Sequence, residues 1–416
     1  MEKSNGVAES AAWACEQIRA LVGRFGPRAP GSPAEWDAQQ AMAAQMQPWA
    51  DSVETEGFPV HRQAFMGFIP FTVLLNMAAA VLFWFQYALA GLVLVTLAAI
   101  PLVLEFAMYR QFIDRLFKAY PSHNVIARRK PAGGAAVKKR IYLVGHADSQ
   151  YEWTLNYRLG GVGMKLVLIP AVVGLIICFC ANLLRFALVD LAHIPAETGF
   201  LRWLFWIAGI VLFVLFPCDI GFLFFQSRRR SVPGANDNLS GCYVAMAALK
   251  ELAEADVRFA DTEVVVLLTG SEEAGLRGAK AYVKKHRAEL LDPAVETVAL
   301  GLDTFRDRKD IAIYNRDLSG TVRHSPLVQQ LMKAAGERCG FDLPSASIYI
   351  GACDAVAFTQ AGVKATGFAA MDPTPPRWYH TRLDDVDLLA PEAIGAGLAI
   401  TLEAVNIFAR EGLAKN

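Results

Sequence analysis

A long uncharged apolar stretch constrains this chain more than any other feature of its sequence. Residues 64–104 contain no Asp, Glu, Lys or Arg. Because about 20 apolar residues are enough to cross the hydrocarbon core of a bilayer, this stretch is long enough for two crossings joined near residues 86–91. The hairpin of a soluble protein would keep a polar stripe, which this stretch lacks. We therefore expect a transmembrane hairpin over residues 65–109.

A second apolar pair follows later in the chain. Residues 166–184 carry no charge, and residues 203–225 carry only Asp219. We expect a second transmembrane hairpin over residues 163–227. Asp219 is a functional candidate because it is ionisable within a span. Three arginines at 228–230 lie within about two turns of it, so we favour a structural role in which Asp219 reaches the interface.

The distribution of charge predicts where the polar segments lie. Each hairpin crosses twice, so every large polar segment lies on one face of the membrane. Basic residues flank the spans on that face, whereas the short far loop carries only Arg185 and Arg202. By the positive-inside tendency, we expect a multi-pass membrane protein whose polar part is cytoplasmic. Scattered cysteines without zinc-finger spacing agree with a reducing compartment, and we expect no signal peptide.

Outside the apolar stretches, strands and helices alternate. We expect two helices within residues 8–47 and a short strand near residues 60–65. Further strands are expected at 140–145, 262–269, 297–303 and 364–369. Further helices are expected at 238–255, after 278, at 325–339 and at 391–411. This alternation predicts an α/β domain with a largely parallel sheet, in which functional side chains follow the strand ends. The domain would be assembled from residues 1–64, 110–162 and 228–416. The whole chain has 40 basic and 40 acidic residues, and this balance of charge argues against a nucleic-acid partner.

Histidine and acidic side chains follow several of these expected strands. Each would have an ordinary structural explanation alone, but together they form the nitrogen and oxygen ligand set that suits zinc. Two such ions about 3.5–4 Å apart can hold a bridging water and lower its pKa. Because neighbouring acids cannot easily share one metal in the same way, one of two adjacent glutamates could ligate while the other acts as general base. The candidates are His146, Asp148, Asp237 in the turn PGANDNLSG, Glu272, Glu273, Asp303 and His380.

Several strings of the sequence resemble metallopeptidase family 28, the di-zinc aminopeptidases, which includes glutamate carboxypeptidases and is related to glutaminyl cyclases. They are GHADS, PGANDNLSG, GSEEAGLRGA, LGLDT, CDAVAFTQAGV and YHTRLDD, in the family's order and approximate spacing. The resemblance covers the N-terminal helices and residues 110–160 and 228–410, and it leaves out both hairpins. It implies a zinc-exopeptidase-like, three-layer α/β/α domain with a mostly parallel mixed sheet, to which about four transmembrane helices are added.

The resemblance also implies which residues hold the metals. Asp237 would bridge two zinc ions, for which cobalt or manganese could substitute. His146 and Asp303 would complete one site, and Glu273 and His380 the other.

Further roles follow from the same resemblance. Glu272 would be the general base that passes a proton to the leaving amine, and Asp148 would orient His146. The peptide bond between Asp237 and Asn238 would be cis. Tyr349 is the nearest candidate for the tyrosine that stabilises the oxyanion, although its offset in the sequence differs from the family pattern.

The leading functional hypothesis is a membrane-embedded zinc aminopeptidase acting on peptides. Closeness of the site to the bilayer suggests an alternative in the same chemistry, an amidase acting on amphiphilic or lipid-linked amino acids. A glutaminyl-cyclase-like transfer is less expected because Asn238, rather than Gly, follows Asp237. A third hypothesis is a non-catalytic membrane receptor or transporter component that keeps a metal site. The sequence leaves the oligomeric state open.

Overall fold

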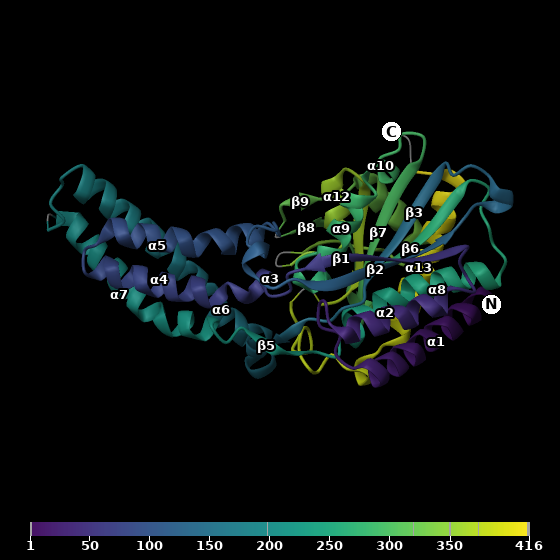
Figure 1. Ribbon diagram of the computed structural model, residues 1–416, viewed down its shortest axis with the longest axis horizontal. Coiled ribbons are helices and arrows are strands. Elements are labelled where there is room, and N and C mark those ends of the chain that lie inside the picture. Colours follow the sequence, from purple (N-terminus) through teal and green to yellow (C-terminus); the bar gives the residue numbers. More distant parts are fainter. Residues whose placement is uncertain (1, 198, 319, 349–350, 373, 414–416) are drawn as a thin grey trace. The chain divides into compact units, whose positions relative to one another are not determined.

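The computed structural model describes residues 2–197, 199–318, 320–348, 351–372 and 374–413. It divides into two compact units (Figure 1). The first unit falls within residues 1–62, 119–151 and 231–416, and the second within residues 63–118 and 152–230. The chain therefore leaves the first unit twice and returns to it twice.

The first unit is built on one mixed sheet with the strand order β1-β2-β6-β3-β7-β11-β8-β10, with β9 paired to β8. The central strands β6, β3, β7 and β11 run parallel, whereas β2 and β8 join them antiparallel. This arrangement confirms the expected mostly parallel mixed sheet. The strands are β1 (Ser52–Val60), β2 (Tyr120–Arg129), β3 (Lys139–His146), β6 (Thr262–Thr269), β7 (Glu296–Phe305), β8 (Ile311–Asp317), β9 (Val322–Arg323), β10 (Ser345–Ser347) and β11 (Lys364–Ala370).

Helices cover both faces of this sheet, which gives the expected three layers (Figure 1). Side chains alternate along β3, so that Ile141 and Leu143 enter one apolar core while Tyr142 and Val144 enter the other. The first core is covered by α1 (Glu2–Phe25), α2 (Pro33–Met46), α8 (Gly241–Glu254), α11 (Pro326–Arg338) and α13 (Pro391–Glu411). The second core is covered by α9 (Arg277–Lys285), α10 (Arg287–Leu290) and α12 (Ala355–Ala361).

Four strands of this sheet, β2, β8, β9 and β10, were missed and one was misplaced in the sequence-based prediction. The strand expected near residues 60–65 instead ends at Val60, and α3 (Ala64–Gly67) follows. β1 carries Gly57 and Pro59 and is half-exposed at the edge of the sheet, where a weak strand pattern is tolerated. β2 lies in a basic segment without clear alternation, and β8 was also not predicted. Both strands are set by pairing with distant segments of the chain.

The chain leaves and re-enters the first unit at neighbouring backbone positions. Val60, the last residue of β1, pairs with Tyr120, the first residue of β2. Val232 N donates to Gln150 O at 2.9 Å. Each excursion of the chain therefore starts and ends at nearly the same point.

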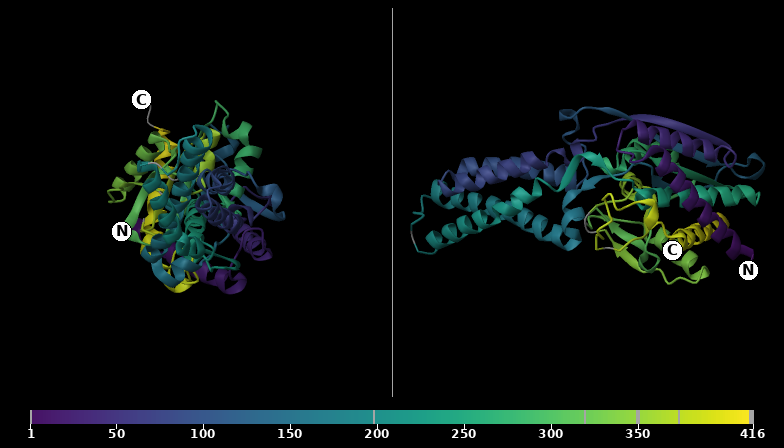
Figure 2. Two further views of the ribbon diagram at one scale, coloured as in Figure 1. Left: turned by 90° about the vertical axis from the view of Figure 1, so that its left-hand side faces the viewer. Right: turned by 90° about the horizontal axis from the view of Figure 1, so that it is seen from below.

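The second unit is a bundle of four long helices that run alongside one another (Figure 2). They are α4 (Ile69–Trp84), α5 (Ala88–Pro101), α6 (Thr154–Arg185) and α7 (Gly199–Phe222). Short π-helical turns extend α5 over Leu102–Ala107 and α6 over Phe186–Leu191, and β4 (Tyr151–Trp153) pairs with β5 (Gln226–Ser231). The outer surface of the bundle is apolar, with Phe213 71% and Leu166 69% exposed. Exposed apolar side chains on this scale mark a surface that meets lipid or protein.

Five helical segments of the described chain are long and apolar enough to cross a membrane, judged by length and composition. Four of them form the bundle. The fifth is α13, whose residues Ile394, Leu398 and Phe408 are fully buried in the core of the first unit. Its apolar character is therefore explained by packing on the sheet.

Asp219 is buried inside the bundle, which corrects the expectation that it reaches the interface. Only 4% of the residue is exposed. Asn76 Nδ2 of α4 lies 3.3 Å from both carboxylate oxygens of Asp219, which belongs to α7. This contact links two helices of the bundle and gives Asp219 a structural role there.

Candidate metal centre

Predicted site residues from three strands meet at one edge of the sheet. β3 ends at His146, and Asp303 lies near the end of its parallel neighbour β7. On the other side of β3, β6 ends at Thr269 and leads into a helical turn that begins at Glu272. Because the carboxyl ends of parallel strands face the same way, these side chains converge outside that edge.

His146, Asp237 and Asp303 form one group of possible ligands. One ligand atom of each lies within 4.8 Å of the others. His146 Nε2 is 3.3 Å from Asp237 Oδ1. Thr304 Oγ1 donates to Asp303 Oδ1 at 2.8 Å and fixes that carboxylate. The structure therefore brings together the three residues expected at one metal.

Asp237, Glu273 and His380 form a second group of the same closeness. His380 Nε2 lies 2.8 Å from Asp237 Oδ2 and 3.3 Å from Glu273 Oε1. Gln150 Nε2 donates to Glu273 Oε2 at 2.6 Å. Asp237 thus presents one oxygen to each histidine, which is the arrangement that a carboxylate shared by two ions requires.

Glu272 lies beside both groups without belonging to either. Its Oε2 is 3.8 Å from His146 Nε2, and the residue is only 6% exposed. It joins a third group with His146 and Glu273. A carboxylate in this position is available for proton transfer next to the ligands, which is where a general base must be.

Asp148 contacts more than the histidine it was expected to orient. Its Oδ1 is 3.4 Å from His146 Nδ1, a long contact for a hydrogen bond. The same oxygen accepts from Glu272 N at 3.0 Å, and Oδ2 accepts from Glu273 N at 3.1 Å. Asp148 therefore fixes the backbone of the glutamate turn as well.

Asp384 holds the turn that carries Asp237, and sequence reasoning missed it. Its Oδ1 accepts from Asn236 N at 2.9 Å, and its Oδ2 accepts from Asp237 N at 3.0 Å. The peptide bond from Asp237 to Asn238 is cis, as expected. Asn238 Oδ1 accepts from Thr304 N at 3.0 Å, which ties the turn to the end of β7. The signal for Asp384 was present, since it lies four residues after His380 in the same string.

Arg28 is a second residue that the sequence analysis missed. The residue is fully buried. Its guanidinium donates to four backbone carbonyls, those of Gly26, Ala147, Pro233 and Gly234, at 2.7–3.1 Å. It thereby joins the segment after His146 to the turn before Asp237.

Glu35 supports the glutamate turn from the N-terminal region. Ser32 caps α2 by accepting from Glu35 N at 3.2 Å. The Glu35 side chain, however, accepts from Ser271 N at 2.6 Å and from Ser122 Oγ at 3.0 Å. Ser271 adopts φ +54°, and His380 adopts φ +53°. Such backbone conformations are uncommon in residues other than glycine and cluster where a site constrains the chain.

Burial and neighbouring charges shift the pKa values of the site residues. Burial raises the pKa of Glu272 well above the usual range and that of Glu273 to about 7. Burial disfavours the charged form of His380, but Glu273 and Asp237 outweigh it and raise the His380 pKa to about 10. The pKa of His146 is likewise raised, because nearby carboxylates led by Glu272 outweigh its burial. Without a metal, both imidazoles therefore keep a proton at neutral pH.

The donor set fits divalent ions such as zinc. It offers two imidazoles and several carboxylates and needs no thiolate. Among the described residues, Asp237 Oδ2 and Glu273 Oε1 are buried without a hydrogen bond of acceptable geometry, although His380 Nε2 lies close to both. A cation held between these three atoms would satisfy all of them.

Metal binding should weaken as the pH falls. The raised pKa values of His380 and His146 mean that both imidazolium protons must leave before the ring nitrogens can ligate. We expect the affinity for zinc to rise from about pH 6 to about pH 9, with protons released on binding. Calorimetry in buffers of different ionisation enthalpy measures this release. An affinity independent of pH would contradict the expectation.

Tyr349, the candidate for oxyanion stabilisation, lies outside the described residues. Its role therefore stays a prediction from the sequence.

The strand-end position of the site and its two overlapping ligand groups suit a metal-dependent hydrolase. Residues 223–405 match the model of Peptidase family M28, and this segment contains every predicted ligand except His146. This segment, which is less than half of the chain, is therefore similar to peptidase family M28, a family of metallopeptidases. No curated protein matched the chain.

Solved structures of this fold span two activities. The chain is similar to BSAP, a zinc aminopeptidase from Bacillus subtilis, with 17% identity and a TM-score of 0.56 over 98% of this chain and 96% of that one. An aminopeptidase from Aneurinibacillus sp. strain AM-1 shares 15% identity with a TM-score of 0.53, and the match covers 99% of this chain and 94% of that one. Fimbriiglobus ruber glutaminyl cyclase shares 14% identity with a TM-score of 0.53, and the match covers 97% of this chain and 95% of that one. At these identities the likeness shows the fold.

Proposed function

We propose that the protein is a zinc aminopeptidase that removes N-terminal residues from peptides. The observation that carries the proposal is the position of Asp237, which presents one oxygen to His146 and the other to His380. A shared carboxylate of this kind supports a pair of ions. A site for a single ion would not need the second ligand group, which contains His380.

Five residues would hold the metals in this proposal. His146 and Asp303 would bind one zinc ion, Glu273 and His380 the other, and Asp237 both. When bound, the ions would supply Lewis-acid chemistry, lowering the pKa of water and polarising the scissile carbonyl.

Glu272 would move the proton. Its carboxylate lies beside the ligand groups and, among the described residues, is free of the hydrogen bonds that fix Asp148 and Glu273. It would accept a proton from the attacking water and donate it to the nitrogen of the leaving amine, so that the amine departs neutral. Its burial would exclude competing bulk water from this transfer.

We further propose that the second unit spans the membrane and that the metallopeptidase unit is cytoplasmic. The apolar outer surface of the bundle and the length of its four helices support the first part. The bias of basic residues toward one side supports the second. A reporter fused at the C-terminus should be active in the cytoplasm, and an extracytoplasmic signal would contradict this orientation.

An amphiphilic or lipid-linked amide is the second candidate substrate. The observation favouring it is that the α6–α7 pair is inserted between the segment carrying His146 and the turn carrying Asp237. The reaction would be the same hydrolysis of an amide next to an amino group.

The test is release of a chromogenic amine from a panel of aminoacyl substrates by detergent-purified protein. We expect turnover that a chelator abolishes and that zinc, cobalt or manganese restores. If the protein binds metal and releases no amine from any aminoacyl substrate, the aminopeptidase proposal is wrong. N-acyl and lipid-linked amides in the same assay then distinguish the amidase from a protein that only binds metal.

A further inference from the structure

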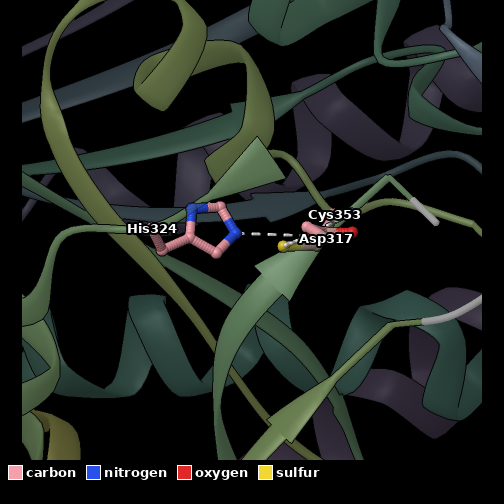
Figure 3. A group of neighbouring side chains, drawn as sticks. All are labelled: Asp317, His324 and Cys353. Atoms are coloured by element: carbon pink, nitrogen blue, oxygen red, sulfur yellow. Dashed lines mark hydrogen bonds and ion pairs between the residues drawn. The ribbon is translucent and has the colours of Figure 1, made fainter. Parts of the chain in front are cut away.

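A second cluster of possible metal ligands lies in the first unit, on segments that the candidate metal centre does not use. It consists of Asp317, His324 and Cys353 (Figure 3). Asp317 is the last residue of β8, and His324 directly follows the short strand β9. Cys353 lies two residues before the start of α12. One ligand atom from each residue lies within 4.8 Å of the others. Two segments of the chain, the paired strands β8 and β9 and the residues before α12, therefore converge on one point.

The three side chains point at one another around the Asp317 carboxylate. His324 Nε2 is 3.5 Å from Asp317 Oδ2, and Cys353 Sγ is 2.9 Å from the same oxygen (Figure 3). Asp317 Oδ1 accepts from Leu318 N at 2.8 Å. The second oxygen, Oδ2, also accepts from Cys353 N at 3.1 Å, so the backbone holds both oxygens of the carboxylate while Oδ2 faces the imidazole and the sulfur.

All three side chains of the cluster are buried, so a negative charge on the Asp317 carboxylate has to be compensated inside the protein. Asp317 has no exposed surface, and His324 and Cys353 are 3% and 2% exposed. Within the described part of the chain, the only ion-pair partner of Asp317 is His324. A buried carboxylate requires a compensating positive charge or a proton. A divalent cation bound by one carboxylate, one thiolate and one neutral imidazole leaves a net charge of zero.

The surroundings of the cluster suit a ligated ion. His324 Nδ1 lies 2.8 Å from Thr359 Oγ1, the kind of contact that fixes the tautomer of a ligating imidazole and leaves Nε2 free for the metal. Gly301 of β7 and Gly367 of β11 leave room for the sulfur of Cys353. A Cβ atom at Gly367 would lie 3.0 Å from Cys353 Sγ, and a Cβ atom at Gly301 would lie 3.5 Å from it.

We propose that Asp317, His324 and Cys353 form a further metal site that binds a zinc ion in a structural role. The thiolate selects a softer ion over magnesium or calcium, and the nitrogen and oxygen ligands are both common in zinc sites. Binding would deprotonate the Cys353 thiol, and that proton would pass to solvent as the sulfur–metal bond forms. The inference goes beyond the proposed peptidase function and does not depend on it.

Such an ion would steady the segment that leads to Asp354. This aspartate follows Cys353 directly, and its Oδ2 accepts from Thr269 Oγ1 at 2.6 Å. Thr269 ends β6, three residues before Glu272. The site would therefore tie the β8 end of the sheet to the strand that carries the glutamate turn, without contributing a ligand to the catalytic metals.

Cobalt substitution tests the proposal because sulfur gives its own spectroscopic signal. The purified full chain is stripped with a chelator and titrated with Co²⁺ alone. Neither ligand group of the candidate metal centre contains a thiol. We therefore expect a near-ultraviolet sulfur-to-cobalt charge-transfer band that Cys353→Ser abolishes and His324→Gln weakens or shifts. Metal analysis should show Cys353→Ser binding one zinc ion fewer per chain.

Two variants serve as controls. Cys15→Ser removes another buried thiol, one that lies in α1 away from both clusters, and should keep the band. Asp237→Asn should lose metal from the candidate centre and also keep the band, which separates this site from the proposed function. If wild-type protein binds Co²⁺ without a sulfur band, the trio is a hydrogen-bonded cluster and the proposal is wrong. A band that disappears with Asp237→Asn would assign the sulfur to the main centre and would equally overturn it.

Discussion

Replacing Glu272 by glutamine is expected to lower kcat for aminoacyl substrates by about 10²–10⁴-fold, the usual contribution of a general base. The substitution keeps the size of the side chain and removes its ability to accept and release a proton. Because Glu272 lies outside the two ligand groups that contain Asp237, the metal content should stay at the wild-type level.

The adjacent residue provides the matched comparison. Glu273→Gln changes the same functional group one position away, but its Oε1 faces His380 Nε2 at 3.3 Å within a ligand group. We expect this variant to lose metal as well as activity. Metal analysis and steady-state kinetics on both proteins measure the difference. If Glu272→Gln loses metal while Glu273→Gln keeps it, the roles of the two residues must be exchanged.

Replacing Arg28 by methionine is expected to destabilise the first unit by about 3–5 kcal/mol. Methionine keeps part of the buried apolar volume, but it leaves the carbonyls of Ala147, Pro233 and Gly234 without their donor. Each unsatisfied buried acceptor costs about 1–3 kcal/mol, and partial entry of water reduces the sum.

The effect of Arg28→Met should extend to metal binding, because the affected carbonyls lie next to His146 and in the turn that carries Asp237. Denaturant unfolding gives the loss of stability, and zinc titration gives the loss of affinity. Arg24→Met is the control, since Arg24 is exposed at the end of α1 and a change there should be nearly neutral. Wild-type affinity in a folded Arg28→Met protein would show that the guanidinium does not position the ligands.

Much of the sheet was predictable because its central strands carry their own signal. β6, TEVVVLLT, is buried along its whole length and reads as an apolar, β-branched run bounded by polar turns. Its bounds were predicted correctly. β2 and β8 gave no such signal, because their strand character comes from pairing with neighbours that are distant in sequence.

The predicted ligands do lie together, and for His146, Asp303 and Glu273 this follows from the ends of neighbouring parallel strands. Their catalytic roles remain predictions. What the sequence could not supply was the support around them. Arg28 and Glu35 resemble ordinary residues of a turn and a helix start, and only the folded chain brings them against the segments after His146 and before Glu272. A buried charge cannot be recognised from a local pattern when its partners lie more than a hundred residues away.

The closeness of the points where the chain departs from the first unit and returns to it has a practical consequence. Val60 is paired with Tyr120, and Gln150 O accepts from Val232 N. Both excursions could therefore be replaced by tight turns of a few residues without stretching the backbone. The shortened chain would be a water-soluble enzyme candidate of ordinary domain size, suited to crystallisation. It would also show whether the proposed peptidase activity needs the bundle.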